Sequence, residues 1–245
     1  SGFWAEGPVL NWETLPARVE GAIEARIARL EPELREILSV ASVEGEGFAV
    51  QVLAQVQGSE EGVLLQQLAQ DLARRHRLVM EQAEVQVGPR RLSRFKFSHV
   101  LVQKYVYRQL SQGERRLLHG KVAAALESCY GERVDEFAVQ LAHHHSRAGD
   151  DGRALPYFTR SAENAHRVYA NEEACAHYTH AIDAAQRVSA DAESLIRLYL
   201  GRGLIYQTLG DFEGALTDYE SALRLAGSTD EPAVEHIEWR TLLKL

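Results

Sequence analysis

Residues 196–227 carry the pattern of two helices that pack very closely against each other. Small residues stand where the helix axes would approach, and aromatic residues stand where the grooves between helical turns would be filled. The small residues are Gly203, Ala215 and Ala222, and the aromatic residues are Tyr199, Tyr206, Phe212 and Tyr219. A break at Gly210-Asp211 separates the two helices. Because such a pair buries its apolar face only against a neighbouring pair, the pattern predicts a stacked helical array.

A second, looser helix pair precedes this one and covers residues 154–166 and 173–185. A helix over 134–148 comes before the two pairs, and a helix over 232–245 follows them. Since that last helix has no partner and no polar cap, we expect the chain to be a piece of a longer protein. The pairs resemble the tetratricopeptide repeat, although Gly227 stands where that repeat usually has proline. The resemblance implies an α-solenoid that binds partners.

The first half of the chain is organised differently. Thr14 is expected to cap a helix that has Pro16 in its first turn and ends before Pro32. The apolar stripe of this helix consists of Val19, Ile23, Ile27 and Leu30. We therefore expect three parts along the chain. They are a linker with its helix over 1–31, a small domain with connecting helices over 32–132, and the helical repeats over 133–245.

The small domain is predicted to contain three helices followed by a β-hairpin. The three helices cover residues 34–43, 49–56 and 60–75, with a turn at 45–47. The residues of the third helix expected to face inward are Val63, Leu64, Leu68 and Leu72. Residues 78–80, 83–87 and 94–97 alternate like strands, with a turn at Gly88-Pro89. Two more helices, 99–109 and 112–130, then lead to the repeats.

Three helices followed by a hairpin is the order of a winged helix. The expected fold class is therefore mainly α, with a winged-helix-like module and its small β-hairpin followed by a tetratricopeptide-type α-solenoid. Charged residues interrupt every apolar stretch, and residues 1–8 lack the basic-then-apolar layout of a signal peptide. We therefore expect a cytoplasmic chain with no membrane partner.

Motifs of the common enzyme classes are missing from the sequence. It contains no GxxxxGK[ST], GxSxG, HExxH or CxxC, so we expect no catalytic residue, no metal and no cofactor in this chain. Cys129 and Cys175 are expected to be buried, reduced thiols. His143, His144 and His145 are consecutive, so their side chains point about 100° apart and cannot converge on one ion. They are predicted to lie on a solvated or groove-lining helix face.

Basic residues gather at the end of the third helix and on the hairpin. They are Arg74, Arg75, His76 and Arg77 on the helix, and Arg90, Arg91, Arg94 and Lys96 on the hairpin. In a DNA-binding winged helix these places meet the groove and the backbone of DNA. Against this, the outer face of the third helix carries glutamines and Asp71, and the net charge of the chain is −8, which opposes binding to phosphates. Nucleic-acid binding is therefore kept only as an alternative.

Residues 95–107 pass from a strand ending in Phe97-Ser98-His99 straight into a helix that carries Tyr105 and Tyr107. This segment resembles the winged-helix region of bacterial signal-transduction ATPases of the STAND class, of the kind attached to adenylate cyclases, LuxR-type regulators and protein kinases. Other segments are similar to that family too. They are residues 15–30, 41–48 and 141–144.

The resemblance implies that ADP or ATP binds to a parent ATPase, whose core is not part of this sequence. It also implies that His99 contacts the bound ADP and holds the closed state, as the corresponding histidine does in related disease-resistance and apoptotic ATPases. Val100 departs from the acidic residue that the plant proteins carry there. Capping of the following helix by His99 is the alternative interpretation.

The joint order of winged helix and repeats favours a regulatory and sensor fragment of such an ATPase. The winged helix would be a switch arm that docks on the parent's own ATPase core, and the repeats would bind a protein or peptide trigger. The expected trigger-binding positions, on the first helix of each pair, are Asn164, Arg167, Arg197, Arg202 and Gln207. We expect the fragment alone to be monomeric. A DNA-binding regulator with a repeat sensor and a plain adaptor are the two alternatives.

Overall fold

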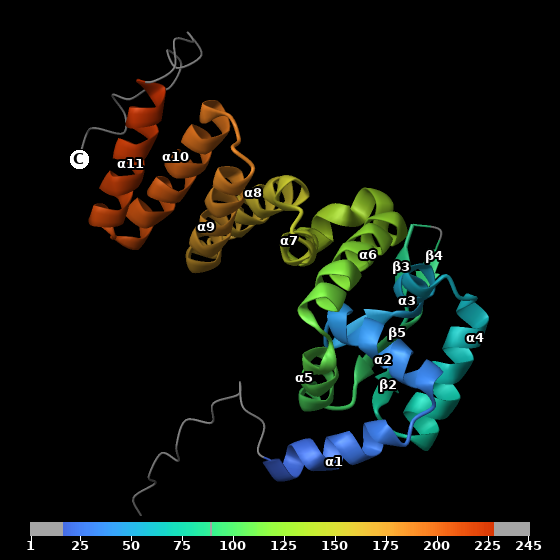
Figure 1. The fold of residues 1–245 in the computed structure, drawn as a ribbon. Helices are drawn as coiled ribbons and strands as arrows, with labels where there is room; N and C mark the ends of the chain where they lie inside the picture. Colours follow the sequence, from blue (N-terminus) through green and yellow to red (C-terminus); the bar gives the residue numbers. More distant parts are fainter. Residues whose placement is uncertain (1–16, 89, 228–245) are drawn as a thin grey trace, which may run out of the picture. The chain divides into compact units, whose positions relative to one another are not determined.

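The computed structural model describes residues 17–88 and 90–227. The chain divides into two compact units, Ser1–Tyr130 and Gly131–Leu245, and each is described here by itself. The expected cap at Thr14, the expected Pro16 in the first turn and the expected helix over 232–245 lie outside the described residues. The mainly helical fold with a small antiparallel sheet, expected from the sequence, is confirmed (Figure 1).

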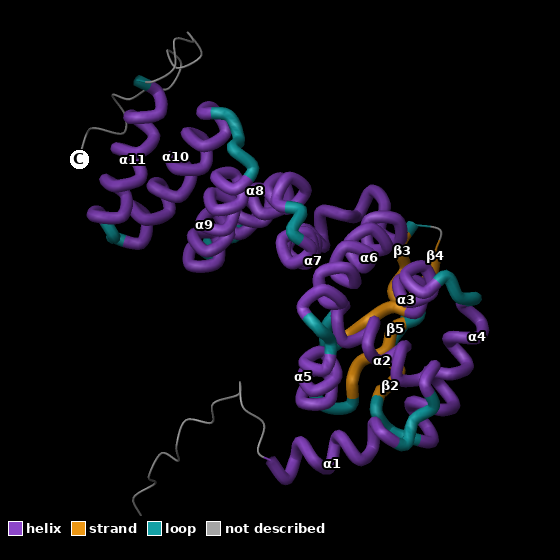
Figure 2. The backbone as a smooth tube through the Cα atoms, in the orientation of Figure 1, coloured by secondary structure: helices purple, strands orange, loops and turns teal. Residues whose placement is uncertain are grey.

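In the described part of the chain, all strands belong to the first unit, where helices surround two small sheets (Figure 2). Its helices are α1 (Ala17–Ala28), α2 (Pro32–Glu44), α3 (Val50–Gln57), α4 (Glu61–Gln66), the π-helix η1 (Gln67–Arg75), α5 (Val100–Gln109) and α6 (Gln112–Tyr130). Its strands are β1 (Gly47–Ala49), β2 (Val79–Glu81), β3 (Val85–Val87), β4 (Arg90–Leu92) and β5 (Arg94–Phe97).

Strand β5 lies between β1 and β2 in an antiparallel sheet, and three phenylalanine rings form the core beside it. Phe48 pairs with Phe95 in the register of β1 and β5, and Phe97 pairs with Val79 of β2. The ring of Phe48 lies 6.3 Å from that of Phe95 and 5.5 Å from that of Phe97, centroid to centroid. Phe95 and Phe97 face the same side because side chains alternate along a strand, as the sequence pattern predicts.

The expected pairing of these strands is wrong in two respects. The strand β3 pairs with β4 across the turn, whereas residues 94–97 pair with β1 and β2 instead of closing the hairpin. Residues 47–49, expected to end a turn and begin a helix, form the edge strand β1. A three-residue strand is too short for alternation of apolar and polar residues to distinguish it from a turn.

The third helix of the first unit changes its hydrogen-bonding register part of the way along. It begins as α4 and continues as the π-helix η1. At the end of η1 the amide of His76 donates a hydrogen bond of 2.8 Å to the carbonyl of Asp71, five residues earlier. Leu64, Leu68 and Leu72 are buried as expected. The expectation for Val63 is wrong, because its side chain is 51% exposed. Adjacent helical residues point about 100° apart, so Val63 cannot share the inward direction of Leu64.

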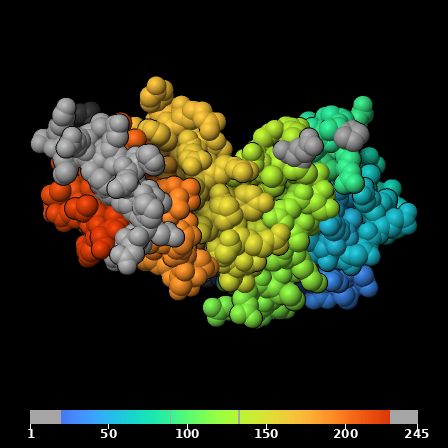
Figure 3. Space-filling view, turned by 90° about the horizontal axis from the view of Figure 1, so that it is seen from above, coloured from blue at the N-terminus to red at the C-terminus, as the bar shows by residue number. Residues whose placement is uncertain are grey.

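The second unit is a succession of helices in which each packs on the next (Figure 1). They are the 3-10 helix η2 (Gly131–Phe137), α7 (Ala138–Ala148), α8 (Asp151–Arg167), α9 (Asn171–Arg187), α10 (Ala192–Leu209) and α11 (Phe212–Ala226). The helix expected from residue 134 begins as an α-helix only at Ala138. Figure 3 shows these helices in space-filling form, from yellow to red along the chain.

Aspartates begin three helices of the second unit. The side chains of Asp150, Asp191 and Asp211 accept hydrogen bonds from the backbone amide of the third residue of α8, α10 and α11. These bonds satisfy amide groups that have no partner within the helix. Gly210 ends α10 with a φ of 81°, a left-handed conformation that glycine adopts without strain.

Two glycines of α10 allow aromatic rings to lie directly on the helix backbone. A Cβ atom added to Gly203 would lie 2.5 Å from the ring of Tyr219 on α11, and one added to Gly201 would lie 2.7 Å from the ring of Tyr178 on α9. Both distances are far below van der Waals contact. The close helix approach predicted from Gly203 is therefore possible because the Tyr219 ring packs directly against the backbone of α10 at that glycine.

Candidate functional site

A groove of about 230 Å³ lies in the second unit between α8, α9 and α10. Its walls come from residues spaced by about one helical turn on α8 and on α10, with Tyr178 of α9 between them. The lining residues are Leu155, Thr159 and Glu163 of α8, Tyr178 of α9, and Ser194, Arg197 and Leu198 of α10. Spacings of three and four residues place side chains on one helix face, so both helices turn a continuous stripe toward the groove.

The groove carries two opposite charges, Glu163 and Arg197. Neither forms an ion pair or a hydrogen bond with any other residue that the structure describes. Their fields are nevertheless felt by their neighbours. Burial, and then the charge of Glu163, raises the pKa of Tyr178, while hydrogen bonds from Ser194 and the charge of Arg197 lower the pKa of Asp191. We call these two groups of the groove, one cationic and one anionic, uncommitted, because neither has an ion-pair or hydrogen-bond partner among the described residues.

The positions expected to bind a trigger are not gathered in one place. Arg197 lines the groove, whereas Asn164 is half-buried on α8 and Arg167 is exposed near the end of that helix. Gln207 is half-buried, and its side-chain oxygen accepts a hydrogen bond of 3.2 Å from the hydroxyl of Tyr219. Only Arg197 of the five thus lies in the groove.

Arg202 is bound within the helical stack. Its Nε and one terminal nitrogen donate to the two carboxylate oxygens of Asp218 at 2.8 and 2.7 Å, and its other terminal nitrogen donates to the hydroxyl of Thr179 at 3.0 Å. Its side chain is 16% exposed, and that of Asp218 is 3% exposed. These hydrogen bonds raise the pKa of Arg202 further. Arg202 therefore joins α9, α10 and α11.

His99 stands at the junction of β5 and α5 with its side chain exposed. Its Nδ1 accepts a hydrogen bond of 3.1 Å from the amide of Leu101, so His99 caps α5. An Nδ1 that accepts carries no proton, so the proton of the neutral ring is on Nε2. The backbone amide and the hydroxyl of Ser98 both donate to the Leu78 carbonyl, at 2.9 and 3.0 Å. The junction is thus fixed on both sides of the imidazole.

The basic residues that the sequence placed on the hairpin do not form one cationic face. Arg90 and Arg91 are exposed and, as strand neighbours, point to opposite sides of β4. Arg91 lies 3.9 Å from the carboxylate of Glu84. Arg94 and Lys96 are half-buried on β5, and within the described structure the Nε of Arg94 is a buried atom with no hydrogen-bond partner. This distribution gives little support to a DNA-binding surface.

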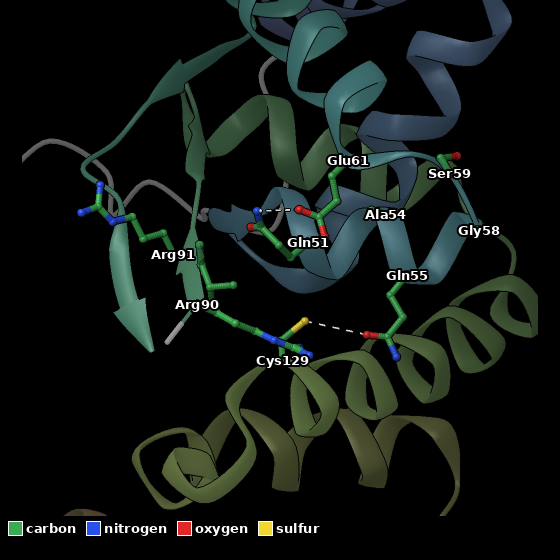
Figure 4. A pocket seen from close by; sticks show the side chains of 10 residues that line it. Gln51, Ala54, Gln55, Gly58, Ser59, Glu61, Arg90, Arg91 and Cys129 are labelled. Carbon is green, nitrogen blue, oxygen red and sulfur yellow. Dashed lines mark hydrogen bonds between the residues drawn. The ribbon is translucent and has the colours of Figure 1, made fainter. Parts of the chain in front are cut away.

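A larger cavity of about 530 Å³ lies in the first unit among α3, β4 and α6 (Figure 4). On its wall the Gln51 side chain donates to Glu61 at 3.2 Å, and the Cys129 thiol donates to the Gln55 side-chain oxygen over 3.8 Å. Arg90 extends toward Cys129 (Figure 4). Burial is the main cause that raises the pKa of Cys129, against a smaller lowering by Arg90. The thiol is therefore protonated and weakly nucleophilic.

Both cysteines are free thiols, but they differ in burial. Cys129 is 7% exposed, as expected, whereas Cys175 is only half-buried, so the expectation of a buried thiol is wrong there. Helix α9 packs on α8 and on α10 through alanines, and this leaves Cys175 on the border of the packed face.

Glu44 is a buried carboxyl group that the sequence pattern did not single out. It ends α2 and accepts a hydrogen bond of 3.0 Å from the amide of Ala49. Burial raises its pKa to about 8, although that hydrogen bond and the charge of Arg94 act in the opposite direction. A glutamate before a glycine at a helix end carries no sign of burial in the sequence.

The three consecutive histidines occupy different environments. His143 is exposed and contacts the rings of Phe158 and His180, with centroid distances of 5.5 and 5.8 Å. His144 and His145 are 4% and 2% exposed, so the expectation of a solvated or groove-lining face is wrong for these two. His145 stacks on the ring of Tyr157 in α8, with the ring centroids 5.7 Å apart. Among the described residues, no group of three or more potential ligands is arranged to hold a metal ion.

Comparison with known proteins gives a family match for part of the second unit. A family model described as tetratricopeptide repeat matches residues 170–228, which include α9, α10 and α11. An uncharacterized protein of Rhizobium meliloti (strain 1021) is 28% identical over 148 residues, which are 58% of this chain and 14% of that protein. No solved structure matches the chain. Within the described helices, none is long and apolar enough to cross a membrane. The family match to residues 170–228 shows that the C-terminal end of the chain carries tetratricopeptide-like helical repeats.

Proposed function

We propose that this chain is the regulatory and sensor region of a multidomain STAND-class ATPase. In this proposal residues 32–132 form an intramolecular switch arm and residues 133–245 bind a protein or ligand that activates the parent. One observation carries the sensor role. The repeats that match the tetratricopeptide model border a groove in which Glu163 and Arg197 are uncommitted. Repeats of this kind generally act as interaction scaffolds rather than catalysts.

The arm is proposed to be a winged helix, and the order of its elements supports this. The helix α2 is followed by the edge strand β1, then by α3, α4 with η1, β2, the β3–β4 hairpin and β5. The central position of β5 between β1 and β2 closes a small sheet against the three helices. The hairpin of β3 and β4 would be the wing.

His99 is proposed to read the nucleotide that is bound to the parent's ATPase core. The exposed ring is held by its Nδ1 contact with Leu101, which leaves the Nε2 proton to be donated outward. A hydrogen bond from that proton to a phosphate of ADP is charge-assisted and stronger than a neutral one. Because the bond would exist only in the closed state, it would shift the population of the switch toward that state.

The experiment separates this role from simple helix capping. We would measure binding of this chain to the separately produced ATPase region of its parent by calorimetry, with ADP and then with ATP. The variants are His99→Ala, which loses both functions, and His99→Asn, which keeps a capping side chain but lacks the imidazole Nε2. The proposal predicts tighter binding with ADP than with ATP, and loss of that difference in both variants.

Two other outcomes would contradict the switch-arm proposal. Binding that is equal with both nucleotides would favour an adaptor, in which the repeats join two proteins without a nucleotide-linked switch. A nucleotide difference that His99→Asn retains and His99→Ala loses would show that His99 acts only as a cap.

A further inference from the structure

We propose that the groove between α8 and α10 binds a free aliphatic α-amino acid as a zwitterion, through Glu163 and Arg197. This inference rests on the proposed sensor function and names the class of ligand for it. It starts from the two uncommitted charges in the groove. A ligand that carries an ammonium group and a carboxylate on one carbon atom would satisfy both.

Glu163 and Arg197 line the groove from opposite walls, one on α8 and the other on α10. Glu163 and Arg197 line the same groove of about 230 Å³, yet they do not form an ion pair with each other. Within the described residues both charges are therefore open to a ligand that lies in the groove. Asp191 is near Arg197 but is committed to capping α10, since its two oxygens accept from the amide and the hydroxyl of Ser194 at 2.8 and 3.0 Å.

The hydroxyl groups of the lining complement both ends of such a ligand. The hydroxyl hydrogen of Thr159 is donated to the Leu155 carbonyl over 3.0 Å, so its oxygen is left to accept from an ammonium group beside Glu163. The hydroxyl of Tyr178 makes no hydrogen bond within the residues that the structure describes. The charge of Glu163 contributes to the raised pKa of Tyr178. Its proton can be donated to a carboxylate oxygen.

The apolar part of the lining and the size of the groove favour an aliphatic side chain. Leu155 and Leu198 contribute the apolar surface, one from each wall. The groove volume of about 230 Å³ is several times the roughly 30 Å³ that one water molecule occupies in the liquid, so a small molecule with an apolar side chain has room there. Leucine has nine non-hydrogen atoms, and its ends match the charged and hydroxyl groups. L-leucine is therefore the probe of choice.

The test is a calorimetric titration of the chain with four matched probes. They are L-leucine, 3-methylbutylamine, which lacks the carboxylate, 4-methylpentanoate, which lacks the amine, and acetyl-leucinamide, which imitates a leucine inside a peptide. We expect L-leucine to bind at least about tenfold more tightly than each of the other three, because each charge-assisted bond contributes substantially to affinity. Binding of acetyl-leucinamide at least as tight as that of L-leucine would identify a peptide as the occupant and overturn the proposal.

Two variants and two controls connect this binding to the groove. Glu163→Gln removes one charge with little change in shape, and Arg197→Gln removes the other charge together with the guanidinium group; each should weaken binding of L-leucine about tenfold or more. The controls Glu220→Gln and Arg224→Gln remove the same two charges from the exposed side of α11. They should leave the affinity unchanged. Equal effects of groove and control variants would show a net-charge effect and contradict the assignment.

Failure of this inference can be distinguished from failure of the proposed function. Nucleotide-dependent docking on the ATPase region is measured without any amino acid present. If docking depends on ADP but L-leucine does not bind, the ligand class is wrong and the sensor proposal survives. If L-leucine binds and docking is independent of nucleotide, the groove is correctly assigned in a protein of another kind.

Discussion

The guanidinium group of Arg202 faces the carboxylate of Asp218 in a two-point ion pair that joins α10 to α11, with N–O distances of 2.8 and 2.7 Å. Asp218 is 3% exposed, and Arg202 is its only ion-pair partner among the residues that the structure describes. Tyr199 and Tyr206 cover the guanidinium, with ring centroids 5.9 and 5.6 Å from its central carbon. The pair is part of the interior of the second unit.

Arg202→Ala should lower the free energy of unfolding of the second unit by about 3 kcal/mol, because it leaves a buried carboxylate without its partner. Arg197→Ala is the matched control on the same helix. Its side chain is exposed and forms no ion pair in the described structure, so the loss should stay within about 0.5 kcal/mol. Urea denaturation followed by circular dichroism measures both. Equal losses would mean that the Asp218 contact contributes nothing specific.

Gly203→Ala should destabilise the second unit by about 1–3 kcal/mol, because the new methyl group would lie 2.5 Å from the Tyr219 ring and force the ring or the helix to move. Gly152→Ala is a control on α8. An added Cβ there would have only ordinary contacts, and alanine favours the helix, so stability should stay unchanged or rise slightly. Thermal unfolding of the two variants gives the comparison. Unchanged stability of Gly203→Ala would show that the stack tolerates a wider spacing.

The first unit should lose stability as the pH rises from about 4.5 to about 8. Burial raises the pKa of Glu44 to about 8 from the ordinary glutamate value of 4.5, so the folded state binds this proton more tightly than the unfolded state. The stabilisation is complete below the unfolded value and is lost as the pH rises through the folded one, by at most about 1.4 kcal/mol per pH unit. Glu44→Gln should flatten this dependence while retaining the hydrogen bond to Ala49.

Amide hydrogen exchange of peptides from residues 32–57 would report this change in the first unit. Glu33→Gln, on the exposed start of α2, is the control and should retain the slope of the wild type. A Glu44→Gln variant with the same pH dependence as the wild type would contradict the buried, raised pKa.

The second unit should respond to pH in the opposite direction. Although His143 is exposed overall, its ring is partly buried against Phe158 and His180, and this desolvation, together with the charges of His180 and Arg147, lowers its pKa. Burial and the charge of His180 lower the pKa of His177, against a raising by Glu173. Unfolded histidines therefore bind protons more readily than these two. Stability should fall as the pH drops below about 6.5. Replacing His143 and His177 together by glutamine should weaken the fall, measured by thermal unfolding at pH 5 and pH 7.5.

The helix ends of the repeats could be predicted because their signals are local. Gly210 and Asp211 mark the end of α10 and the start of α11 through a left-handed glycine and a capping carboxylate, both of which act within a few residues. The edge strand β1 could not be predicted, because its three residues owe their conformation to β5, which lies more than 40 residues away. Likewise, no residue type in the sequence predicts the π-helical hydrogen bonding of η1.

The residues that line the groove could be predicted only in part, because they too depend on contacts between distant segments. Arg197 and Arg202 are both polar residues on the first helix of a pair, and the sequence treats them alike. Their difference comes from Asp218, whose position relative to α10 depends on how α11 packs. Glu163 had the regular spacing with Leu155 and Thr159 that could have identified it, but Tyr178 enters the groove from another helix. Such combinations require the tertiary structure.

The two rings on α10 limit how that helix can move. Gly201 and Gly203 are about 200° apart around the helix, so Tyr178 presses on one side of its backbone and Tyr219 on the other. Helix α10 therefore cannot move toward α9 or toward α11 without displacing one of these rings. Because the three helices pack this closely, we expect the proposed ligand, if it pulls on Arg197, to shift α10 together with its neighbours. Binding of a ligand in the groove would thus be transmitted to α11 as a common displacement of α9, α10 and α11.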